Sequence, residues 1–310
     1  MKAKPSILPL KSCYLYAISS PSELGRRLSP HSPLTPVELQ KLATDNGNFK
    51  LFQTGKPGKK RDVQEPKTQL QALHKRVHRL LSRVAVADYL HSTVKGRSYV
   101  TNASAHDGAI PAIKIDVKKF FPSVKRVAVY RFFADVMACR PDVAGLLADL
   151  LTFNGHLATG SGASPILAFY CHKPMFDELA ELAARYGLTM TCYVDDITMS
   201  GEGAGKSVLQ KAHRIIASHG LRSHKMKHFK PNEPRVITGV CNTPSGRKVP
   251  NRLHLGIKTD FETLAKAQTA KDRSKAISRI HGRLHAAGQI DQTFKARAQS
   301  FKAALKSGVM

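Results

Sequence analysis

The chain has 310 residues, with 49 Lys and Arg against 22 Asp and Glu, and a formal net charge of +27 at pH 7. Hydrophobic residues make up 42% of it, enough to bury a core, which excludes bulk disorder. No stretch reaches the ~18 unbroken apolar residues of a membrane helix, and Pro9 and Lys11 interrupt the N-terminal apolar segment, so we expect neither an anchor nor a signal peptide. The five cysteines, an odd number without C-x-x-C spacing, fit reduced thiols, and we expect a cytoplasmic protein.

The positive charge is unevenly distributed along the chain. Residues 201–310 carry 22 Lys and Arg but only 6 Asp and Glu, a net +16, and the first 200 residues carry the other +11. A protein this basic binds polyanions. The distribution predicts a C-terminal module that grips nucleic acid, and a basic solubilising surface is the alternative that charge alone leaves open.

The first part of the chain alternates between helical and strand patterns. Thr35-Pro36 is a helix start signal within a helical, proline-broken segment at 1–48. The patterns that follow predict a strand, a turn and a second strand over 49–65, an amphipathic helix over 68–91, a polar loop over 98–106 and a half-buried strand over 112–117.

The second part begins with a helix that Ser123 is expected to cap and that runs to about Cys139. Later patterns predict a glycine-rich loop at 159–165, a helix from Ser164 to about Arg185 with a kink at Pro174, two β-prone runs over 188–200, a helix at 205–219, a short strand at 235–240 and basic helices from about 258 onward. Strands clustered in the middle of such an order indicate the α+β class with an antiparallel sheet.

Asp195 and Asp196 lie where the two β-prone runs of 188–200 meet. Adjacent acids repel each other, and the sequence lacks the Asn-Gly or Asp-Gly pair of a favoured hairpin turn. A divalent cation would remove the repulsion, because hard cations prefer carboxylate oxygens. For this pair taken alone, an ordinary acidic surface turn is the alternative.

Asp116 ends the strand 112–117 and points to the face opposite Ile115 and Val117. If that strand lies beside the 189–200 hairpin, Asp116 and Asp195 converge. Their carboxylates could then hold two metal ions roughly 3.5–4 Å apart, a geometry that aligns an attacking hydroxyl with a leaving phosphate. A surface acid at a strand end is the alternative.

Five segments, in order along the chain, resemble the motifs of retron-type bacterial reverse transcriptases. IKIDVKKFFPSV (113–124) resembles the first palm motif, and CYVDDITMS (192–200) resembles the Y-x-D-D motif. The other three resemble the N-A-x-x-H, G-L-x-x-N-x-x-K and V-T-G elements: NASAH (102–106), HGLRSHKMKHF (219–229) and VITGV (236–240).

The resemblance implies a right-hand polymerase with fingers, a palm built on an antiparallel sheet, and a helical thumb. It assigns 1–105 to N-terminal helices and fingers, 106–240 to the palm with interleaved finger elements, and 241–310 to a basic helical thumb.

The resemblance also assigns the chemistry. Catalytic roles fall on Asp116, Asp195, Asp196 and Lys227, with Lys227 as the general acid that protonates departing pyrophosphate. Metal contacts fall on Asp116, Val117, Asp195 and Asp196, for two Mg²⁺ ions, with Mn²⁺ as a substitute. A solvated lysine in a basic run is the alternative for Lys227.

Nucleotide contacts are implied at two places. Phe121 matches the aromatic gate that excludes a 2′-hydroxyl, and a core aromatic is its alternative. The finger hairpin would clasp the triphosphate through Arg61, with Lys56 and Lys60 nearby, because guanidinium binds phosphate with two parallel hydrogen bonds. Nonspecific contact with RNA is the alternative for this hairpin.

Template and primer contacts are implied at Asn102, His106, Tyr193, Thr238 and Gly239. The alternatives are a loop that Asn102 and His106 merely stabilise, and a strand with a tight backbone contact at Thr238-Gly239.

The chain departs from the family pattern at three positions. Where the family has P-Q-G-x-x-x-S-P, residues 158–165 read ATGSGASP, so Thr159 replaces the Gln that contacts the incoming nucleotide beside Gly160. This puts nucleotide affinity, fidelity or rate in question. His224 replaces the Asn before the late lysine, and Ile237 is inserted in the V-T-G element.

These residues predict an RNA-directed DNA polymerase of a retron. The expected partners are a structured non-coding RNA that serves as template and 2′-hydroxyl primer, its branched cDNA product (msDNA), dNTPs, and an effector protein in anti-phage defence. The alternatives are a reverse transcriptase of another bacterial class, an RNA-copying RNA polymerase, which Phe121 disfavours, and a non-catalytic RNA-binding protein on a palm scaffold.

Overall fold

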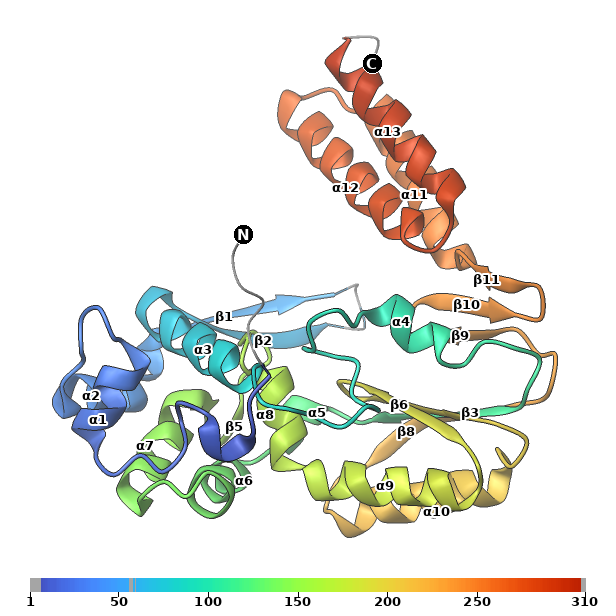
Figure 1. The fold of residues 1–310 in the computed structure, drawn as a ribbon. Coiled ribbons are helices and arrows are strands. Elements are labelled where there is room, and N and C mark those ends of the chain that lie inside the picture. Colours follow the sequence, from blue (N-terminus) through green and yellow to red (C-terminus); the bar gives the residue numbers. More distant parts are fainter. Residues whose placement is uncertain (1–6, 56–57, 59, 308–310) are drawn as a thin grey trace.

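The computed structural model describes residues 7–55, 58 and 60–307, and Figure 1 shows how their helices and strands are arranged. The first elements are η1 (Leu10–Ser12), α1 (Pro21–Leu28), α2 (Pro36–Thr44), η2 (Asn46–Asn48), β1 (Phe49–Thr54), β2 (Arg61–Pro66) and α3 (Thr68–Leu81). The start signal at Thr35-Pro36 is confirmed: the Thr35 hydroxyl caps the Glu38 N–H, and the Glu38 carboxylate reaches back to Thr35. The predicted hairpin is confirmed as β1 paired with β2.

The middle of the chain carries the central sheet and the helices around it. Its elements are α4 (Tyr99–Ser104), β3 (Ala112–Val117), α5 (Phe120–Ser123), α6 (Arg126–Arg131), the π-helical turn η3 (Phe132–Val136), α7 (Pro141–Leu151), β4 (Thr152–Phe153), β5 (His156–Leu157), α8 (Ser164–Cys171), α9 (Lys173–Arg185), β6 (Thr189–Tyr193), β7 (Asp196–Ser200), α10 (Lys206–Ser218) and β8 (Ser223–Phe229). The single helix expected over 164–185 with a kink at Pro174 is instead two helices, because α8 ends at Cys171 and α9 begins at Lys173 with Pro174 in its first turn.

The central sheet has the strand order β6-β7-β3-β8, and every neighbouring pair is antiparallel. Helices α9 and α10 cover one face of it (Figure 1). On β3, Ile113, Ile115 and Val117 are buried in the main apolar core, which also contains residues of α10. Because side chains alternate along a strand, Lys114 and Asp116 lie on the opposite face. The sheet therefore presents its polar face away from α9 and α10.

Several local expectations were wrong, among them the length of the helix expected over 68–91, since α3 ends at Leu81. The expected loop at 98–106 contains α4, whose N-cap Ser98 forms a reciprocal capping pair with Thr101. The expected elements include no strand between 219 and 235, but this interval contains β8, an edge strand that shows little apolar alternation because few of its side chains are buried. Ser123 ends α5 and bonds to the Lys118 carbonyl, so it does not cap the helix that follows.

The chain ends in a small sheet and a helical bundle. A three-stranded antiparallel sheet consists of β9 (Arg235–Ile237), β10 (Val240–Thr243) and β11 (Gly246–Lys248). The helices α11 (Asn251–Ala265), α12 (Ala270–Gly288) and α13 (Gln292–Lys306) follow and enclose an apolar core of their own. They stand on the side of the central sheet opposite α9 and α10 (Figure 1). Strand β10 crosses the predicted boundary at 240/241, and the three-part division of the chain stays a prediction.

Two further expectations concern the whole chain. All five cysteines are free thiols. Among the described helices, none combines the length and the hydropathy needed to cross a bilayer.

A buried histidine ties α4 to the central sheet. His106 is fully buried, and its two ring nitrogens lie 2.7 Å from the Ser200 Oγ on β7 and 2.7 Å from the Thr191 Oγ1 on β6. Its carbonyl oxygen accepts a hydrogen bond from Arg235 Nη2 at 2.8 Å, which connects the same turn to β9. Burial lowers the pKa of His106 to about 3, so the ring is neutral in the folded protein.

This histidine makes stability depend on pH. The unfolded chain binds a proton at His106 below a pKa of about 6.5, whereas the folded chain stays neutral down to about 3. Because the unfolded state then holds more protons, the free energy of unfolding falls as pH drops below about 6.5, by up to about 1.4 kcal/mol per pH unit. Urea unfolding between pH 7 and pH 5 should show a smaller loss for His106→Gln than for the wild type. Equal pH slopes would contradict this assignment.

Candidate active site

Three aspartates meet at one end of the central sheet. Asp116 on β3 lies directly opposite Asp196 on β7, so their side chains share a face. Asp195 precedes Asp196 in the β6–β7 turn, and its carbonyl accepts a hydrogen bond from the Val117 N–H at 2.9 Å. The strand with Asp116 therefore lies beside the hairpin with Asp195, the arrangement on which their expected convergence depends.

The turn that carries Asp195 is strained. Tyr193 and Asp196 are paired, which leaves a two-residue turn whose first residue, Val194, has φ +59°. Glycine is usual at this position, and a β-branched side chain there costs on the order of 1–3 kcal/mol. The buried Ser92 hydroxyl accepts a hydrogen bond from the Val194 N–H at 3.1 Å and holds the turn from outside the sheet.

The aspartates are surrounded by positive groups. Lys225 Nζ lies 3.1 Å from Asp116 Oδ2, and Lys114 Nζ lies 3.2 Å from Asp196 Oδ2. Asp195 has no ion pair among the described residues, and its pKa is raised to about 6 by burial and then by the negative charge of Asp116. The site therefore favours additional positive charge next to Asp195.

A β-bulge in β8 delivers Lys225 to Asp116. Along β3, Lys114 is opposite Lys227 but Asp116 is opposite His224, so β8 has one extra residue in this interval. Lys225 lies in the bulge with φ +50°, a conformation that few residues other than glycine adopt. The backbone irregularity thus places an ammonium group on the carboxylate.

The donor set fits a divalent cation. Asp116 Oδ1 is buried and forms no hydrogen bond: His224 Nδ1 lies 2.7 Å away but is aligned instead with the Asp116 backbone carbonyl, at 3.3 Å. Within the described ranges, no three His, Cys, Asp or Glu side chains gather as metal ligands. Mg²⁺ is commonly held by only one or two carboxylates together with substrate phosphates, a set that Asp116, Asp195 and the backbone oxygen of Val117 match.

Lys227 lies on the same face as the aspartates but does not contact them. It is exposed on β8, directly opposite Lys114. Its role as a general acid stays a prediction, and the structure shows that Lys225 is the lysine of β8 at the carboxylates.

Phe121 is half-buried and lies just after β3, the strand that carries Asp116. It belongs to α5, and its ring stacks on Phe120, with centroids 6.1 Å apart and planes 29° apart. Phe120 is buried and packs edge-on against Phe176 of α9. The core therefore fixes Phe121, which a rigid gate requires and which its alternative as a packing residue also allows.

The predicted triphosphate contacts lie on the β1–β2 hairpin. Arg61 begins β2 opposite Thr54, and both Arg61 and Lys60 are exposed. Neither forms an ion pair among the described residues. Lys56 falls outside the described residues.

The Thr159-Gly160 loop docks on β2. The Gly160 N–H donates to the Gln64 carbonyl at 3.1 Å, and Thr159 Oγ1 lies 2.9 Å from the Asp62 carbonyl and 3.0 Å from Gln64 Oε1. The Thr159 hydroxyl is therefore hydrogen-bonded to β2. Gln64 places an amide beside the position where the family pattern has its glutamine.

Two of the residues expected to contact RNA are inaccessible in this conformation. Asn102 and His106 are both fully buried, and His106 uses both ring nitrogens inside the protein. Asn102 Nδ2 lies 3.4 Å from Thr238 Oγ1, which itself donates to the Tyr99 carbonyl at 2.7 Å. In this conformation the pair stabilises the junction between α4 and β9–β10, as the alternative interpretation has it, and contact of Asn102 and His106 with RNA stays a prediction.

The other three positions remain accessible. Tyr193 and Thr238 are half-buried, and Gly239 is exposed with φ +89°. Contact of these residues with RNA stays a prediction.

Sequence reasoning missed Ser92, Lys114, Lys225 and Gln64. Ser92 and Gln64 act through long-range contacts that no local pattern reveals. Lys114 had a usable signal, since it lies two residues before Asp116 on the same strand face and must therefore point toward the acids. Lys225 required knowledge of the bulge.

Comparison with known proteins agrees with this geometry. Residues 53–240 match the family described as reverse transcriptase (RNA-dependent DNA polymerase). The chain is 27% identical over 210 residues to the Retron Se72 reverse transcriptase of Salmonella heidelberg, covering 62% of this chain and 54% of that protein. It is 33% identical over 205 residues to the Retron Mx65 reverse transcriptase of Myxococcus xanthus, covering 58% and 48%. The chain thus spans about half the length of these relatives.

A solved structure shows the same fold. The foamy viral protease-reverse transcriptase in complex with double-stranded DNA superimposes with a TM-score of 0.50 at 16% identity, covering 99% of this chain and 46% of that one. The expected α+β right-hand polymerase fold is confirmed. The chain belongs to the reverse transcriptase family, and the two relatives described above are retron reverse transcriptases.

The contact between the Thr159-Gly160 loop and β2 can be tested at one glycine. A Cβ at Gly160 would lie 2.7 Å from the Gln64 carbonyl oxygen and 2.9 Å from the Glu65 Cα, whereas a Cβ at Gly162 would meet open space. Gly160→Ala should therefore lower the free energy of unfolding by about 1–3 kcal/mol, and Gly162→Ala should leave it nearly unchanged. Urea unfolding of both variants measures the difference, and equal stabilities would refute the docking.

The counter-charge from the bulge can be tested at Lys225. Lys225→Met removes the ammonium from Asp116, while Lys227→Met removes the same charge from the same strand without an aspartate contact. Without divalent ions, Lys225→Met should be the less stable of the two, by no more than about 1 kcal/mol because Lys225 is largely exposed. Added Mg²⁺ should raise its melting temperature more than that of Lys227→Met. The same response in both variants would be inconsistent with this role.

Proposed function

We propose that this protein is the RNA-directed DNA polymerase of a retron. It copies a structured non-coding RNA, starting from a 2′-hydroxyl of that RNA, and the product is single-stranded DNA joined to RNA through a branch. The observation that carries the proposal is the meeting of Asp116, Asp195 and Asp196 at one sheet end, in a chain that belongs to the reverse transcriptase family.

The sheet end would position the reacting groups. Asp116 and Asp195 supply carboxylates from two adjacent strands, and the hydrogen bond between Val117 and Asp195 fixes their spacing. A divalent pair held here would lower the pKa of the primer hydroxyl and stabilise the leaving pyrophosphate. The protein contributes positioning and preorganised charge, which is most of what phosphoryl transfer requires.

Other residues would bind and select the nucleotide. Arg61 and Lys60 on the finger hairpin contact the triphosphate, and Gly160 supplies close packing between the loop and β2. Phe121, fixed by the core, lies under the sugar and excludes a 2′-hydroxyl. Lys227 would supply a proton to pyrophosphate from the exposed face of β8.

The finer biological role rests on the resemblance to retron reverse transcriptases. The relatives are named as retron enzymes, which supports a non-coding RNA as both template and primer. The same resemblance supports a role in defence against phage together with an effector protein.

The catalytic assignment predicts a separation of synthesis from RNA binding. Asp195→Asn combined with Asp196→Asn should reduce dNTP incorporation on an RNA template by more than about 10³-fold, because the carboxylates that hold the cations are lost. RNA affinity should stay equal or rise slightly, since two negative charges are removed. Primer extension and filter binding measure the two quantities.

The matched control removes two exposed acids elsewhere. Asp135→Asn with Glu202→Gln makes the same charge change away from the sheet end, and both side chains are exposed. Synthesis by this control should equal that of the wild type. A wild type that makes no cDNA from its own RNA with Mg²⁺ would overturn the proposed function.

The sugar gate makes a prediction about nucleotide choice. Phe121→Ala opens the space under the sugar, so incorporation of NTPs relative to dNTPs should rise by at least about tenfold, as expected for the loss of a steric contact. The ratio of kcat/KM for the two nucleotides on one RNA template measures it and is independent of the amount of active protein. An unchanged ratio would mean that Phe121 packs in the core and does not select the nucleotide.

A further inference from the structure

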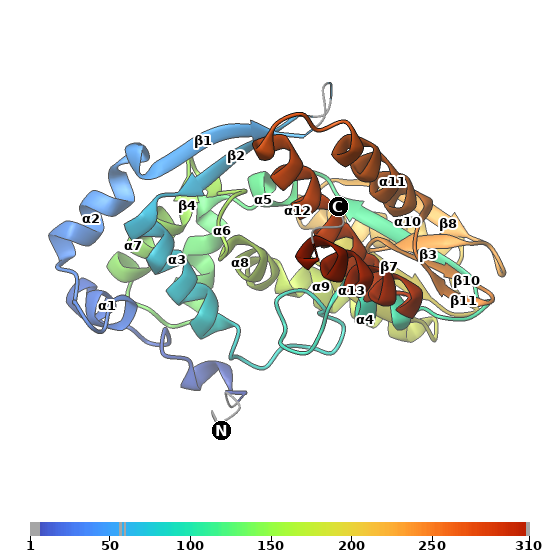
Figure 2. The same ribbon diagram turned by 90° about the horizontal axis from the view of Figure 1, so that it is seen from above.

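A cluster of four arginines lies in the N-terminal part of the fold, and two of them, Arg27 and Arg76, contact the ring of Tyr14. It consists of Arg27 on α1, Arg76 and Arg79 on α3, and Arg83 just after α3; we call it the arginine cluster. None of these residues belongs to the catalytic site. In both views α1 lies at the end of the molecule away from β3 and β8 (Figures 1 and 2).

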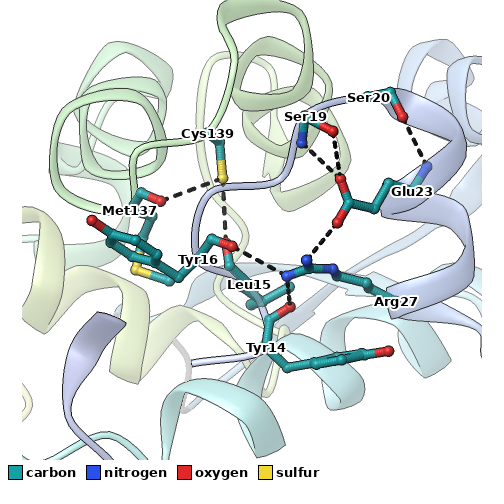
Figure 3. A network of polar contacts seen from close by, with 9 residues as sticks. All are labelled: Tyr14, Leu15, Tyr16, Ser19, Ser20, Glu23, Arg27, Met137 and Cys139. Carbon is teal, nitrogen blue, oxygen red and sulfur yellow. Dashed lines mark hydrogen bonds and ion pairs between the residues drawn. The ribbon is translucent and has the colours of Figure 1, made fainter. Parts of the chain in front are cut away.

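Arg27 is the fixed centre of the cluster. Its guanidinium donates to the Tyr14 carbonyl at 2.8 Å and to the Tyr16 carbonyl at 3.1 Å, and it pairs with Glu23 (Figure 3). Glu23 is itself held by the backbone N–H and the hydroxyl of Ser19, each at 2.8 Å. Arg27 is therefore neutralised and serves to shape the Tyr14 segment.

The other three arginines carry unbalanced charge. Arg76 lies with its guanidinium carbon 5.7 Å from the centroid of the Tyr14 ring, and its Nε donates to the Arg27 carbonyl at 3.1 Å. Arg79 and Arg83 are exposed. Within the described part of the chain, no acid pairs with any of the three. The pKa of Arg76 is lowered by burial and then by the charge of Arg79, with a smaller contribution from Arg83, so both of these arginines lie close enough to repel Arg76.

Like charges held together without an acidic partner among the described residues favour a polyanion. Arg76 and Arg79 are three residues apart on one face of α3, roughly 4.5 Å along its axis, and Arg83 lies two residues beyond the end of the helix. The planar guanidinium matches the oxygens of a phosphate. A row of such groups suits successive phosphates of a nucleic-acid backbone.

The aromatic ring at the centre is already engaged. Tyr14 is half-exposed, but the guanidinium carbons of Arg27 and Arg76 lie over its ring, at 5.0 and 5.7 Å from the centroid. Proteins that bind single strands use aromatic faces on which bases stack. Recognition of base-paired RNA proceeds through shape and backbone instead. The cluster therefore fits a duplex better than an unpaired strand.

We propose that the arginine cluster binds the sugar–phosphate backbone of a base-paired region of RNA, at a distance from the strand that is copied. The inference rests on the proposed function, which supplies a structured RNA as the substrate. It adds a second point of attachment by which one folded RNA is recognised as a whole.

The test compares two double variants that each remove two positive charges. Arg79→Gln with Arg83→Gln changes the cluster, and Lys206→Gln with Arg214→Gln changes exposed residues of α10. The probes are an RNA hairpin, an unpaired RNA of equal length and poly-glutamate, each titrated over a range of salt concentrations. Thermal melting confirms that both variants are folded.

The cluster variant should bind the hairpin about tenfold more weakly than the α10 variant at moderate salt, and the slope of log affinity against log salt should fall by about 1.8, or about 0.9 per phosphate lost. Equal hairpin affinities would overturn the inference, as would an equal loss for the unpaired RNA or a loss confined to poly-glutamate. Failure of the proposed function is distinguishable, because it would appear as absent cDNA synthesis by the wild type whatever the binding results.

Discussion

The rest of the site depends on the repulsion among three carboxylates at one sheet end. Strand pairing brings Asp116, Asp195 and Asp196 together. The backbone hydrogen bonds between the strands fix where these side chains lie, even though their negative charges repel each other. Two lysines partly neutralise this negative charge: Lys114 on the same strand as Asp116, and Lys225 on a bulge of the neighbouring strand. Asp195 receives no lysine in the described structure, and its raised pKa marks the place where a bound cation would be stabilised most.

Local strain and buried polar contacts keep this arrangement in place. Val194 and Lys225 both adopt positive φ beside the carboxylates, and such outliers persist only where surrounding contacts determine them. Ser92 holds the Val194 turn, and His106 ties the opposite end of the β6–β7 hairpin to α4. Through Arg235 and Asn242, the same α4 region is bonded to the small sheet that leads to the C-terminal helices. The β6–β7 hairpin and the small sheet below the helical bundle are thus bonded to the same α4 region.

Much of this could be predicted from the sequence because the decisive signals were local. The alternation around Asp116, the paired acids and the start signal at Thr35-Pro36 each depend on a few neighbouring residues, and they gave the fold class and the aspartates. Strand β8 was missed because an edge strand needs little apolar alternation, and with it the bulge that aims Lys225 was missed. His106 was expected to contact RNA because a sequence motif does not reveal whether its side chains are buried. The contacts of Gln64 with Thr159 join residues 95 positions apart, and no local pattern carries that information.

The central claim is that the aspartates form a cation site, and equilibrium binding of Mn²⁺ tests it most directly. Electron paramagnetic resonance in the presence of a deoxynucleoside triphosphate measures free Mn²⁺ as protein is added. The wild type should bind Mn²⁺, and a folded Asp116→Asn variant should have lost this binding. Binding that survives this substitution unchanged, or its absence in the wild type, would contradict the account.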